Sequence, residues 1–537
     1  MNEQLQSEPR RAVNAFNPSQ AEPATAGCGS QPSGGHLLLL LVLIVLTATN
    51  MAAQPASPPA PPKYEVRAAW ITTLYALDWP KTKATSPESM RRQQEELISM
   101  LDRLQAAGFN TVLFQARTRG DVTYNSRIEP YSSVLTGTSG RSPGYDPLAF
   151  VVEECHRRGM ECHAWMVALP LGSTRHARSL GNRSVTRQQP GICLTYGSGH
   201  FLNPAHPKTK EYLASLICEV VEQYDVDGIH LDYLRYPEKA GSFPDAADYR
   251  RYGKGRSREQ WRRDNLTNIL RHVYREVKAR KPWVKVSTCP VGKYADTSRY
   301  PSGGWNALNT VYQDPVAWLR EGIQDQIYPM MYFRGNSFYP FALDWVEQSA
   351  GRQVVPGLGI YFLDPREGDW KVDEVERQVR FLRQHGLSGQ GHYRTEFLMN
   401  NIQGLYDLLR SRYYTHPALV PPMTWLDSIP PTAPTNLTIV ALSEGYWQLS
   451  WQASTDNPGP SAGSSQPAPT YVVYAADGHA PNTSDPTNIL ASGLRDTTFI
   501  YAPDRPWDVR THFTVTAVDR YGNESRAAET VVSDREP

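Results

Sequence analysis

The chain has 537 residues, enough for a large enzyme domain and a smaller second one, because single cores stop growing near ~250–300 residues. Its composition, 40% hydrophobic and 20% charged, is typical of globular proteins and excludes global disorder. Lysine and arginine total 55 and aspartate and glutamate 54, so the formal net charge of +1 excludes the basic field of nonspecific nucleic-acid binders. The 29 tyrosines and 13 tryptophans are a notable excess, and aromatic rings suit stacking on sugars as well as packing in cores.

The first clear pattern is an unbroken apolar run, Leu37–Leu46, with arginines upstream. Ten residues are too few to cross a ~30 Å hydrocarbon core as a helix, but they match the apolar region of a secretory signal. Ala52 and Ala53 offer small residues for cleavage, and prolines follow. We predict a signal peptide over residues 1–53 and a Pro-rich linker over 54–63, with an uncleaved membrane anchor as the alternative.

Cysteine usage indicates neither a disulfide framework nor a metal centre. Five cysteines remain after the predicted leader, so at most two disulfides can form, and a core of this size does not need them. No cysteine or histidine spacing typical of structural zinc is present. We therefore expect no metal and no cofactor.

From Glu65 to about Tyr414, short β-rich runs alternate with amphipathic helical stretches. The predicted strands are Val66–Thr73, Asn110–Ala116, Glu161–Val167, Gly228–Leu234, Lys285–Cys289, Gln326–Tyr332, Val354–Ile360 and Gly389–Arg394. The predicted helices are Glu88–Ala107, Pro147–Arg158, Lys208–Tyr224, Trp261–Arg280, Pro315–Glu321, Leu343–Gln348, Asp373–His385 and Asn400–Ser411. Eight such repeats predict an α/β fold, a (β/α)8 TIM barrel over residues 64–428. A doubly wound open sheet is the alternative, but no GxGxxG follows the first strand.

Residues 429–537 change to an all-β pattern after a cluster of prolines. The predicted strands are Leu437–Val440, Tyr446–Trp451, Tyr471–Ala475, Thr498–Tyr501 and His512–Asp519. Pro434, Leu437, Trp451, Tyr471 and the run Tyr521–Ser525 resemble a fibronectin type III sandwich. We expect a spacer or docking module there, without catalytic residues.

In a barrel, active-site groups come from the carboxyl ends of the strands and the loops that follow. The fourth predicted strand carries His230, Asp232 and Leu234 on one face by alternation. A carboxylate at a strand end, amid aromatic residues and beside Arg235, has no obvious packing role. The sequence therefore predicts that Asp232 is catalytic, with an Asp232–Arg235 ion pair that organises the loop as the alternative.

The other predicted strand ends are rich in polar and aromatic side chains. Together with the loop after the fourth strand they supply further candidates: Gln115, Arg117, Asp121, His163, Trp165, Tyr233, Arg235, Tyr332 and Glu396. Such a mixture suits an oligosaccharide, whose ring faces stack on aromatic residues while its hydroxyls bind polar groups. The set as a whole indicates this, because a single aromatic residue at a strand end is more often part of a core.

Several motifs between about residues 65 and 410 resemble the glycosyl-hydrolase-like family 10, barrels of bacterial envelopes. They are Glu65–Thr73, Leu77–Pro80, Gly108–Asn110, Phe114–Arg117, Gly120–Asp121, Tyr131–Ser132, Leu135–Gly137, Tyr145–Leu148, His163–Trp165, Leu202–Pro204, Tyr224–His230 and Trp261–Asn265. The resemblance implies an exported glycosidase, periplasmic or bound to the envelope, that cleaves peptidoglycan glycan strands stripped of stem peptides. It implies a polysaccharide partner, without nucleic acid or a stable membrane span, and adds Trp70 and Asn203 to the substrate-binding candidates.

The chain departs from the usual family pattern at three strand ends. Val167 stands where the family often has Asn, Met330 lies where it often has Gln, and Tyr233 follows Asp232 where a second Asp is common. These departures bear on substrate preference.

Glycoside hydrolysis usually needs two carboxyl groups, one of them protonated. We predict Asp232 as the general acid, with its pKa raised by an apolar pocket, and Glu396 or Asp121 as the second group. A separation of ~5–5.5 Å between the two carboxyl groups indicates retention and ~6.5–9.5 Å inversion. The alternatives are a noncatalytic glycan-binding protein and a metal-dependent hydrolase using His163, His230 and Asp232, although the latter lacks an HxH or HExxH spacing.

Overall fold

The structure is a computed structural model that describes residues 60–302, 304–442, 446–456, 467–502 and 510–533. The predicted signal peptide and most of the linker lie outside these residues. Within the described ranges, no helix combines the length and apolar character needed to cross a membrane.

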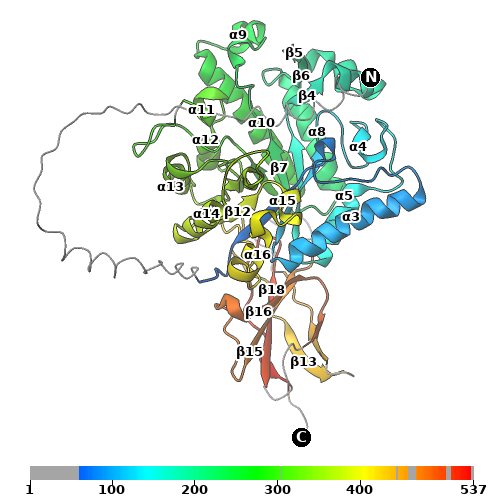
Figure 1. Ribbon diagram of the computed structural model, residues 1–537, viewed down its shortest axis with the longest axis vertical. Helices are drawn as coiled ribbons and strands as arrows, with labels where there is room; N and C mark the ends of the chain where they lie inside the picture. Colours follow the sequence, from blue (N-terminus) through cyan, green and yellow to red (C-terminus); the bar gives the residue numbers. More distant parts are fainter. Residues whose placement is uncertain (1–59, 303, 443–445, 457–466, 503–509, 534–537) are drawn as a thin grey trace, which may run out of the picture. The chain divides into compact units, whose positions relative to one another are not determined.

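A nine-stranded, all-parallel sheet forms the centre of the α/β region (Figure 1). In spatial order its strands are β10 (Gln353–Val354), β9 (Gln326–Ile327), β8 (Lys285–Thr288), β7 (Gly228–Asp232), β3 (Glu161–Val167), β2 (Thr111–Arg117), β1 (Val66–Ile71), β12 (Gly389–His392) and β11 (Gly357–Leu358). The sheet is curled, because Met330, just beyond β9, pairs in parallel with Gly357 of β11 at the other end of the strand order.

Every predicted strand of this sheet has an observed counterpart, and the differences arise mainly at prolines. The predicted strand Gln326–Tyr332 is reduced to the two residues of β9, and Pro329 interrupts its continuation. The predicted strand Val354–Ile360 is divided by Pro356 into β10 and β11. A proline has no N–H to donate to a ladder, so pairing stops at these positions.

Helices surround the sheet (Figure 1). The main ones are α3 (Pro87–Ala106), α5 (Pro147–Arg157), α8 (Pro207–Gln223), α10 (Arg258–Arg280), α12 (Pro315–Glu321), α13 (Tyr339–Glu347) and α14 (Val372–Gln384). Capping explains where they begin: the Ser86 hydroxyl accepts the Ser89 N–H before α3, and the Asp146 carboxylate caps α5 in the same way. The predicted helix Asn400–Ser411 is instead three short pieces, η8 (Ile402–Gly404), α16 (Leu405–Leu408) and η9 (Leu409–Tyr413).

The loop after β3 contains structure that the sequence pattern did not predict. A small antiparallel sheet is formed by β4 (Pro170–Ser173), β6 (Gly199–Leu202) and β5 (Cys193–Tyr196). Its strands are four residues long, too short to show a clear period of two.

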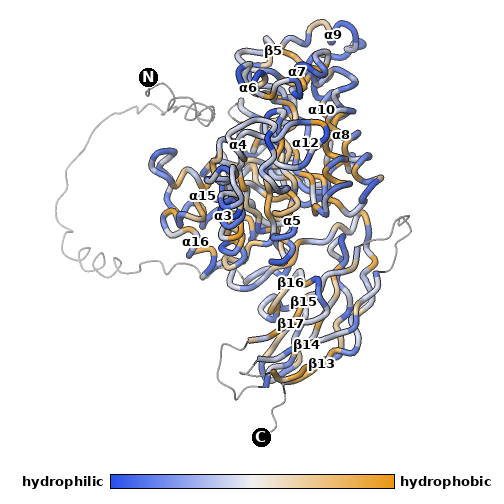
Figure 2. Tube along the Cα trace, turned by 90° about the vertical axis from the view of Figure 1, so that its right-hand side faces the viewer, coloured by the Kyte–Doolittle hydropathy of each residue, from blue (hydrophilic) through white to orange (hydrophobic). Residues whose placement is uncertain are grey.

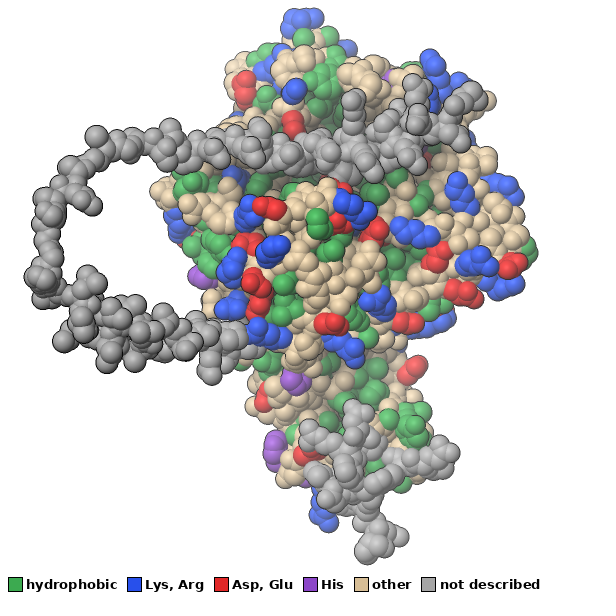
Figure 3. All heavy atoms as spheres, viewed as in Figure 1, with side chains coloured by type: hydrophobic (Ala, Val, Ile, Leu, Met, Phe, Trp, Pro, Cys, Tyr) green, Lys and Arg blue, Asp and Glu red, His purple; other side chains and the backbone are tan. Residues whose placement is uncertain are grey.

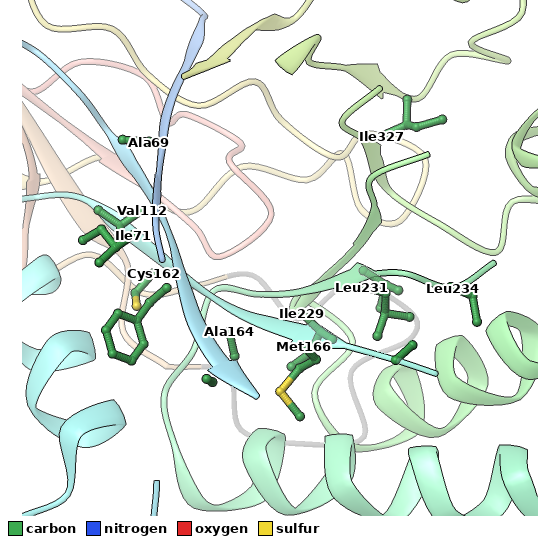
Figure 4. Close-up of a cluster of buried hydrophobic side chains, with 14 of the residues drawn as sticks. Ala69, Ile71, Val112, Cys162, Ala164, Met166, Ile229, Leu231, Leu234 and Ile327 are labelled. Atoms are coloured by element: carbon green, nitrogen blue, oxygen red, sulfur yellow. The ribbon is translucent and has the colours of Figure 1, made fainter. Parts of the chain in front are cut away.

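Alternation along the parallel strands separates two hydrophobic cores. The outer core lies between the sheet and the helices, and Figure 4 shows part of it, including Ala69, Ile71, Ala164, Ile229 and Leu231. The inner core lies on the opposite face of the strands and comprises Val66, Ala68, Trp70, Leu113, Trp165, Cys289, Tyr328, Met330 and Val355.

The C-terminal region is all-β. One sheet has the order β13 (Thr435–Ala441), β14 (Trp447–Gln452), β17 (Thr498–Tyr501), and the other β16 (Ile489–Leu494), β15 (Thr470–Asp477), β18 (Thr511–Val518), β19 (Val531–Val532). Both are antiparallel, and their strands contain both hydrophilic and hydrophobic residues (Figure 2). Their shared core contains Trp451, Tyr471 and Phe513.

Charge on the face in Figure 3 is mixed, with Lys and Arg side chains interspersed among Asp and Glu. This pattern agrees with the net charge of +1.

Candidate active site

Strand β7 presents two polar side chains to the inner face of the sheet. Ile229 and Leu231 point into the outer core (Figure 4), so His230 and Asp232 face the other way, toward the inner core. Asp232 is the last residue of β7 and is 5% exposed. The predicted catalytic carboxyl therefore lies at the carboxyl end of a central strand, where its environment is mostly apolar.

Asp232 is held by donors from three strand ends. Its Oδ2 accepts the indole N–H of Trp165 at 3.2 Å, and its Oδ1 accepts the backbone N–H of Tyr233 at 2.6 Å. Burial raises the pKa of Asp232, while the Cys289 thiol, the charge of Arg235 and the two N–H donors oppose that rise. A carboxyl with a raised pKa in an apolar site suits proton donation.

The chain turns sharply after Asp232. Tyr233 has a φ of 51°, which ends the strand, and its ring is 37% exposed with the Arg235 guanidinium 4.6 Å from the ring centroid. The alternation expected to place Leu234 beside Asp232 is wrong, because Leu234 instead joins Leu231 in the outer core (Figure 4). The turn thus places the ring of Tyr233 and the guanidinium of Arg235 together in the loop that follows Asp232.

The loop geometry also bears on the alternative of an Asp232–Arg235 ion pair. The charge of Arg235 lowers the pKa of Asp232, and Arg235 also lies 3.9 Å from Glu238. Arg235 is therefore close to the acid and acts on it electrostatically.

Aromatic rings surround this position. Trp165 lies with its ring centroid 6.5 Å from that of Tyr393, and Tyr393 stacks on Tyr332 at 5.5 Å with an interplanar angle of 24°. Both tyrosines are partly exposed, whereas Trp70 is 2% exposed within the inner core. An added Cβ at Gly391 would lie 2.4 Å from the Trp70 ring, so a glycine is needed beside it. Tyr332, Trp165 and Tyr393 therefore form the wall next to Asp232, and Trp70 packs beneath it.

The two predicted candidates for the second carboxyl group have different environments. Glu396, in α15 (Thr395–Met399), has a side chain that is 34% exposed and hydrogen-bonded to Arg394. Asp121 is buried, and its Oδ1 accepts the Thr118 hydroxyl and the backbone N–H of Arg119. Glu396 is thus accessible to a substrate, while Asp121 is committed to its own loop.

Asp78 is a carboxyl at the site that the sequence analysis did not select. Its oxygens accept the N–H groups of Thr72 at 2.7 Å and Glu396 at 2.8 Å, and Arg394 lies 2.8 Å away. Burial raises its pKa against the opposing charge of Arg394. Asp78 therefore ties the loop after β1 to the loop after β12. Its place in the loop after β1, in the run Leu77–Pro80, was the available signal.

The phenol of Tyr393 is within electrostatic range of two acidic groups. Burial raises its pKa, the charge of Arg394 opposes that rise, and the charges of Asp78 and Asp232 add to it.

Two predicted substrate-binding residues on β2 bond to protein groups. The amide oxygen of Gln115 accepts the N–H groups of Thr73 at 3.0 Å and Leu74 at 2.7 Å. Arg117 is fully buried and makes two hydrogen bonds to Glu129, at 2.8 and 2.7 Å. Both residues therefore support the rim rather than line it.

The two predicted histidines are buried on the inner face. His230 Nε2 accepts the indole N–H of Trp70 at 3.2 Å, so its Nδ1 carries the proton and donates to Ser287 Oγ at 2.9 Å. Burial lowers the pKa of His230 well below its ordinary value. His163 bonds Glu161 at 3.0 Å, near the start of β3 and away from the rim.

Asn203, the remaining candidate, caps the start of a turn. Its Nδ2 donates to Asp248 at 2.9 Å and its Oδ1 accepts the Ala205 N–H at 3.1 Å. It stabilises the segment between β6 and α8.

No cluster of three or more His, Cys, Asp or Glu side chains suited to a metal ion occurs among the described residues. The metal-dependent alternative named His163, His230 and Asp232, and both nitrogens of His230 bond to protein groups. The cysteines within the described ranges, Cys155, Cys162, Cys193, Cys218 and Cys289, are all free thiols.

The site geometry can be set beside known proteins. The family model described as glycosyl hydrolase-like 10 matches residues 65–362, a range that includes Asp232 and Trp165. The chain belongs to this family. It is 33% identical over 491 residues to glycosyl hydrolase YngK of Bacillus subtilis, covering 87% of this chain and 92% of that protein. It is 32% identical over 379 residues to glycosyl hydrolase DigH of Escherichia coli K12, covering 64% of this chain and 86% of that protein.

Among solved structures, the glycoside hydrolase domain of PgaB (BpsB) from Bordetella bronchiseptica is 18% identical with a TM-score of 0.46, covering 65% of this chain and 99% of that one. By its family and its relatives, this member of glycosyl hydrolase-like family 10 is a glycoside hydrolase.

Proposed function

We propose that this protein is an exported glycoside hydrolase that cleaves glycosidic bonds in peptidoglycan glycan strands lacking stem peptides. The observation that carries the proposal is the buried carboxyl of Asp232, bonded by Trp165 at the carboxyl end of β7 and bordered by Tyr332 and Tyr393. A protonated carboxyl beside aromatic rings suits a sugar and its leaving oxygen. The motifs shared with glycosyl hydrolase-like family 10 support this glycan as the substrate.

The architecture in this proposal is a (β/α)8 barrel. We take β10 and β11 as one strand interrupted at Pro356, which leaves eight strands. The pairs β9–β10, Met330–Gly357 and β11–β12 then close the sheet on itself. The C-terminal sheets, with three and four strands, support a fibronectin type III-like sandwich, for which we propose a docking role.

In the proposed mechanism Asp232 is the general acid that protonates the departing glycosidic oxygen. Glu396 is the second carboxyl, because its side chain is accessible and its backbone is held by Asp78. Arg394 forms an ion pair with Glu396, and its second ion pair with Asp78 holds the guanidinium in place.

Export is proposed from the apolar run Leu37–Leu46, which precedes a proline-rich stretch. A peptidoglycan substrate requires that the enzyme reach the periplasm or the cell envelope.

The test is to incubate the purified protein with glycan strands freed of stem peptides by an amidase, with untreated peptidoglycan and with chitin oligosaccharides. We expect cleavage products by mass spectrometry from the peptide-free strands. Asp232→Asn should cleave about 10²–10⁴-fold more slowly, while Asp373→Asn, at an exposed position in α14, should cleave normally. Binding of the strands without cleavage by the unmodified protein would instead indicate a noncatalytic glycan-binding protein.

A further inference from the structure

We propose that a positively charged lobe at the end of the sheet that carries Asp232 binds a linear phosphate polymer, distinct from the glycan that the enzyme cleaves. The lobe consists of residues 170–206, which follow β3, and residues 237–264, which follow β7. The inference goes beyond the proposed function, since it concerns a second ligand and a surface without proposed catalytic residues.

The two segments of the lobe pack against each other. Strands β3 and β7 are parallel neighbours in the sheet, so both segments leave it at its carboxyl end. The ring of Tyr196 lies 5.5 Å from that of Phe243, and Asn203 Nδ2 donates to Asp248 at 2.9 Å. Figures 1 and 2 both show α9 (Ala246–Tyr252) close to β5. The segments therefore present one continuous surface.

The lobe is far more positive than the chain as a whole. Residues 170–206 contain four arginines and no aspartate or glutamate, and residues 237–264 contain eight lysines and arginines against five acidic residues. The lobe thus carries a formal surplus of seven positive charges, whereas the whole chain has a net charge of +1. The net charge does not reveal this asymmetry because acidic residues elsewhere in the chain balance it.

Most of the positive charge on the lobe is exposed and is not paired with acids. In the described part of the chain, the ion pairs of its lysines and arginines are made by Arg256, Arg258 and Arg262. Seven further cations are exposed and make no ion pair with a described residue: Arg175, Arg178, Arg187, Lys239, Arg250, Arg251 and Lys254. These seven side chains are accessible to a ligand.

The acidic side chains of the lobe offset little of this exposed charge. Asp245 is fully buried and pairs with two arginines, Asp264 pairs with a third, and Asp248 accepts a hydrogen bond from an asparagine. Glu238 and Glu259 are exposed, so two exposed acids face seven exposed cations. The surface therefore keeps a positive potential that attracts polyanions.

The chemistry of this surface favours a densely charged phosphate chain. Exposed arginines and lysines bind a polyanion mainly by releasing the counterions condensed on it, which requires closely spaced charges. A polymer with one phosphodiester in each short repeat meets this condition better than a glycan whose carboxylates are separated by whole sugar rings. Five of the seven exposed cations are arginines, whose planar guanidinium groups match phosphate oxygens.

The same surface is poorly suited to a bilayer or to nucleobases. Among the described residues of the lobe, no leucine, isoleucine, valine, methionine or aromatic side chain is exposed. A bilayer would need apolar side chains to insert, and bases would need exposed rings on which to stack. The partner is therefore a water-soluble polymer of phosphodiesters without bases.

The probe is fluorescently labelled poly(glycerol phosphate), and its binding to the purified protein is measured by anisotropy over a range of salt concentrations. We expect the logarithm of the binding constant to fall linearly with that of the salt concentration, by about 0.7 for each phosphate contact. Arg250→Gln combined with Arg251→Gln should reduce this slope by roughly 1.4, and Arg175→Gln combined with Arg178→Gln on α6 (Thr174–Ser179) should do the same.

The matched control is Arg91→Gln combined with Arg92→Gln, an exposed pair of neighbouring arginines on α3, which should leave the slope unchanged. Undetectable binding at low salt would overturn the inference, and so would lobe variants that keep the slope of the unmodified protein.

Three further ligands test the identity of the polymer. Tighter binding of single-stranded DNA of equal charge would indicate recognition of bases, and tighter binding of anionic phospholipid vesicles would indicate a membrane partner. Equal affinity for a uronic acid polymer would show that charge spacing plays no part. Each of these results would overturn the assignment to a phosphate polymer. None of them depends on cleavage of glycan strands, so the proposed function stands or fails separately.

Discussion

The indole N–H of Trp165 donates a hydrogen bond of 3.2 Å to Oδ2 of Asp232, across the neighbouring strands β3 and β7. This bond favours the ionised carboxyl and so limits the rise in pKa that burial causes. Trp165 thereby helps to orient the proposed acid and opposes the rise in its pKa.

Replacing Trp165 with Phe keeps an aromatic ring but removes this donor. We expect kcat/KM to fall on the order of tenfold, because a hydrogen bond to a charged group is lost. The pKa of Asp232 should rise, so the alkaline limb of the pH–rate profile should move to higher pH. Unchanged limbs in the profile would show that Trp165 does not contact the titrating acid.

Replacing Asp232 with Asn should lower kcat by about 10²–10⁴-fold, the range typical of a lost general acid. Folding should not suffer. Because burial raises the folded pKa, Asp232 favours the folded state at low pH and this contribution is lost as pH rises through the folded pKa. Above that pH the neutral amide avoids burying a charge. Thermal unfolding at pH 7 should therefore show a midpoint equal to or above that of the unmodified protein, and a large fall would point to a structural role.

Glu396→Gln and Asp121→Asn distinguish the two candidates for the second carboxyl. We expect Glu396→Gln to lower kcat by about 10²–10⁴-fold and added azide to restore turnover by replacing the lost nucleophile or base. The configuration of the resulting glycosyl azide then reports retention or inversion. Asp121→Asn should mainly weaken its loop, since its carboxyl bonds Thr118 and the Arg119 backbone. Azide rescue of Asp121→Asn instead would reverse this assignment.

His392 makes the stability of the enzyme sensitive to acid. It is fully buried, its Nδ1 donates to the Ala68 carbonyl at 3.2 Å, and burial lowers its pKa from 6.5 to about 4. Because the pKa of His392 is lower in the folded state than in the unfolded state, its neutral ring stabilises the fold above about pH 6.5. This stabilisation is lost as the pH falls toward 4. The loss from this group amounts to at most about 3 kcal/mol.

Thermal midpoints between pH 4 and 7 test this. His392→Gln should flatten the pH dependence, because the amide can still donate to Ala68 but cannot titrate. His385→Gln, at an exposed position, should leave the dependence as it is. If both variants keep the slope of the unmodified protein, other buried groups such as His230 are responsible for it.

Local periodicity was sufficient to predict much of the fold from the sequence. The observed β3 has the predicted bounds, Glu161–Val167, and α12 has the predicted bounds, Pro315–Glu321. In both, the repeat of apolar residues and the flanking turn residues agree with the packing. The short strands β4, β5 and β6 carry too few residues for a period, so the sequence pattern did not predict them.

The same reasoning placed Asp232 at a strand end, because alternation puts it opposite the apolar face of Ile229 and Leu231. It did not show that Gln115 bonds to the loop after β1 or that Arg117 bonds to Glu129. These two residues could therefore not be separated from residues that remain accessible. Nor did it select Asp78, whose partners Arg394 and Glu396 are more than 300 residues away in the chain.

The sequence by itself thus determined the strand–helix alternation, the position of the acid and the aromatic character of its surroundings, since these depend on residues close together in the chain. Only the tertiary structure decided which polar side chains are satisfied by protein partners and which carboxyl lies exposed beside Arg394. Hydrogen bonds between distant loops leave no periodic trace in a sequence, and they decide which groups remain for the substrate.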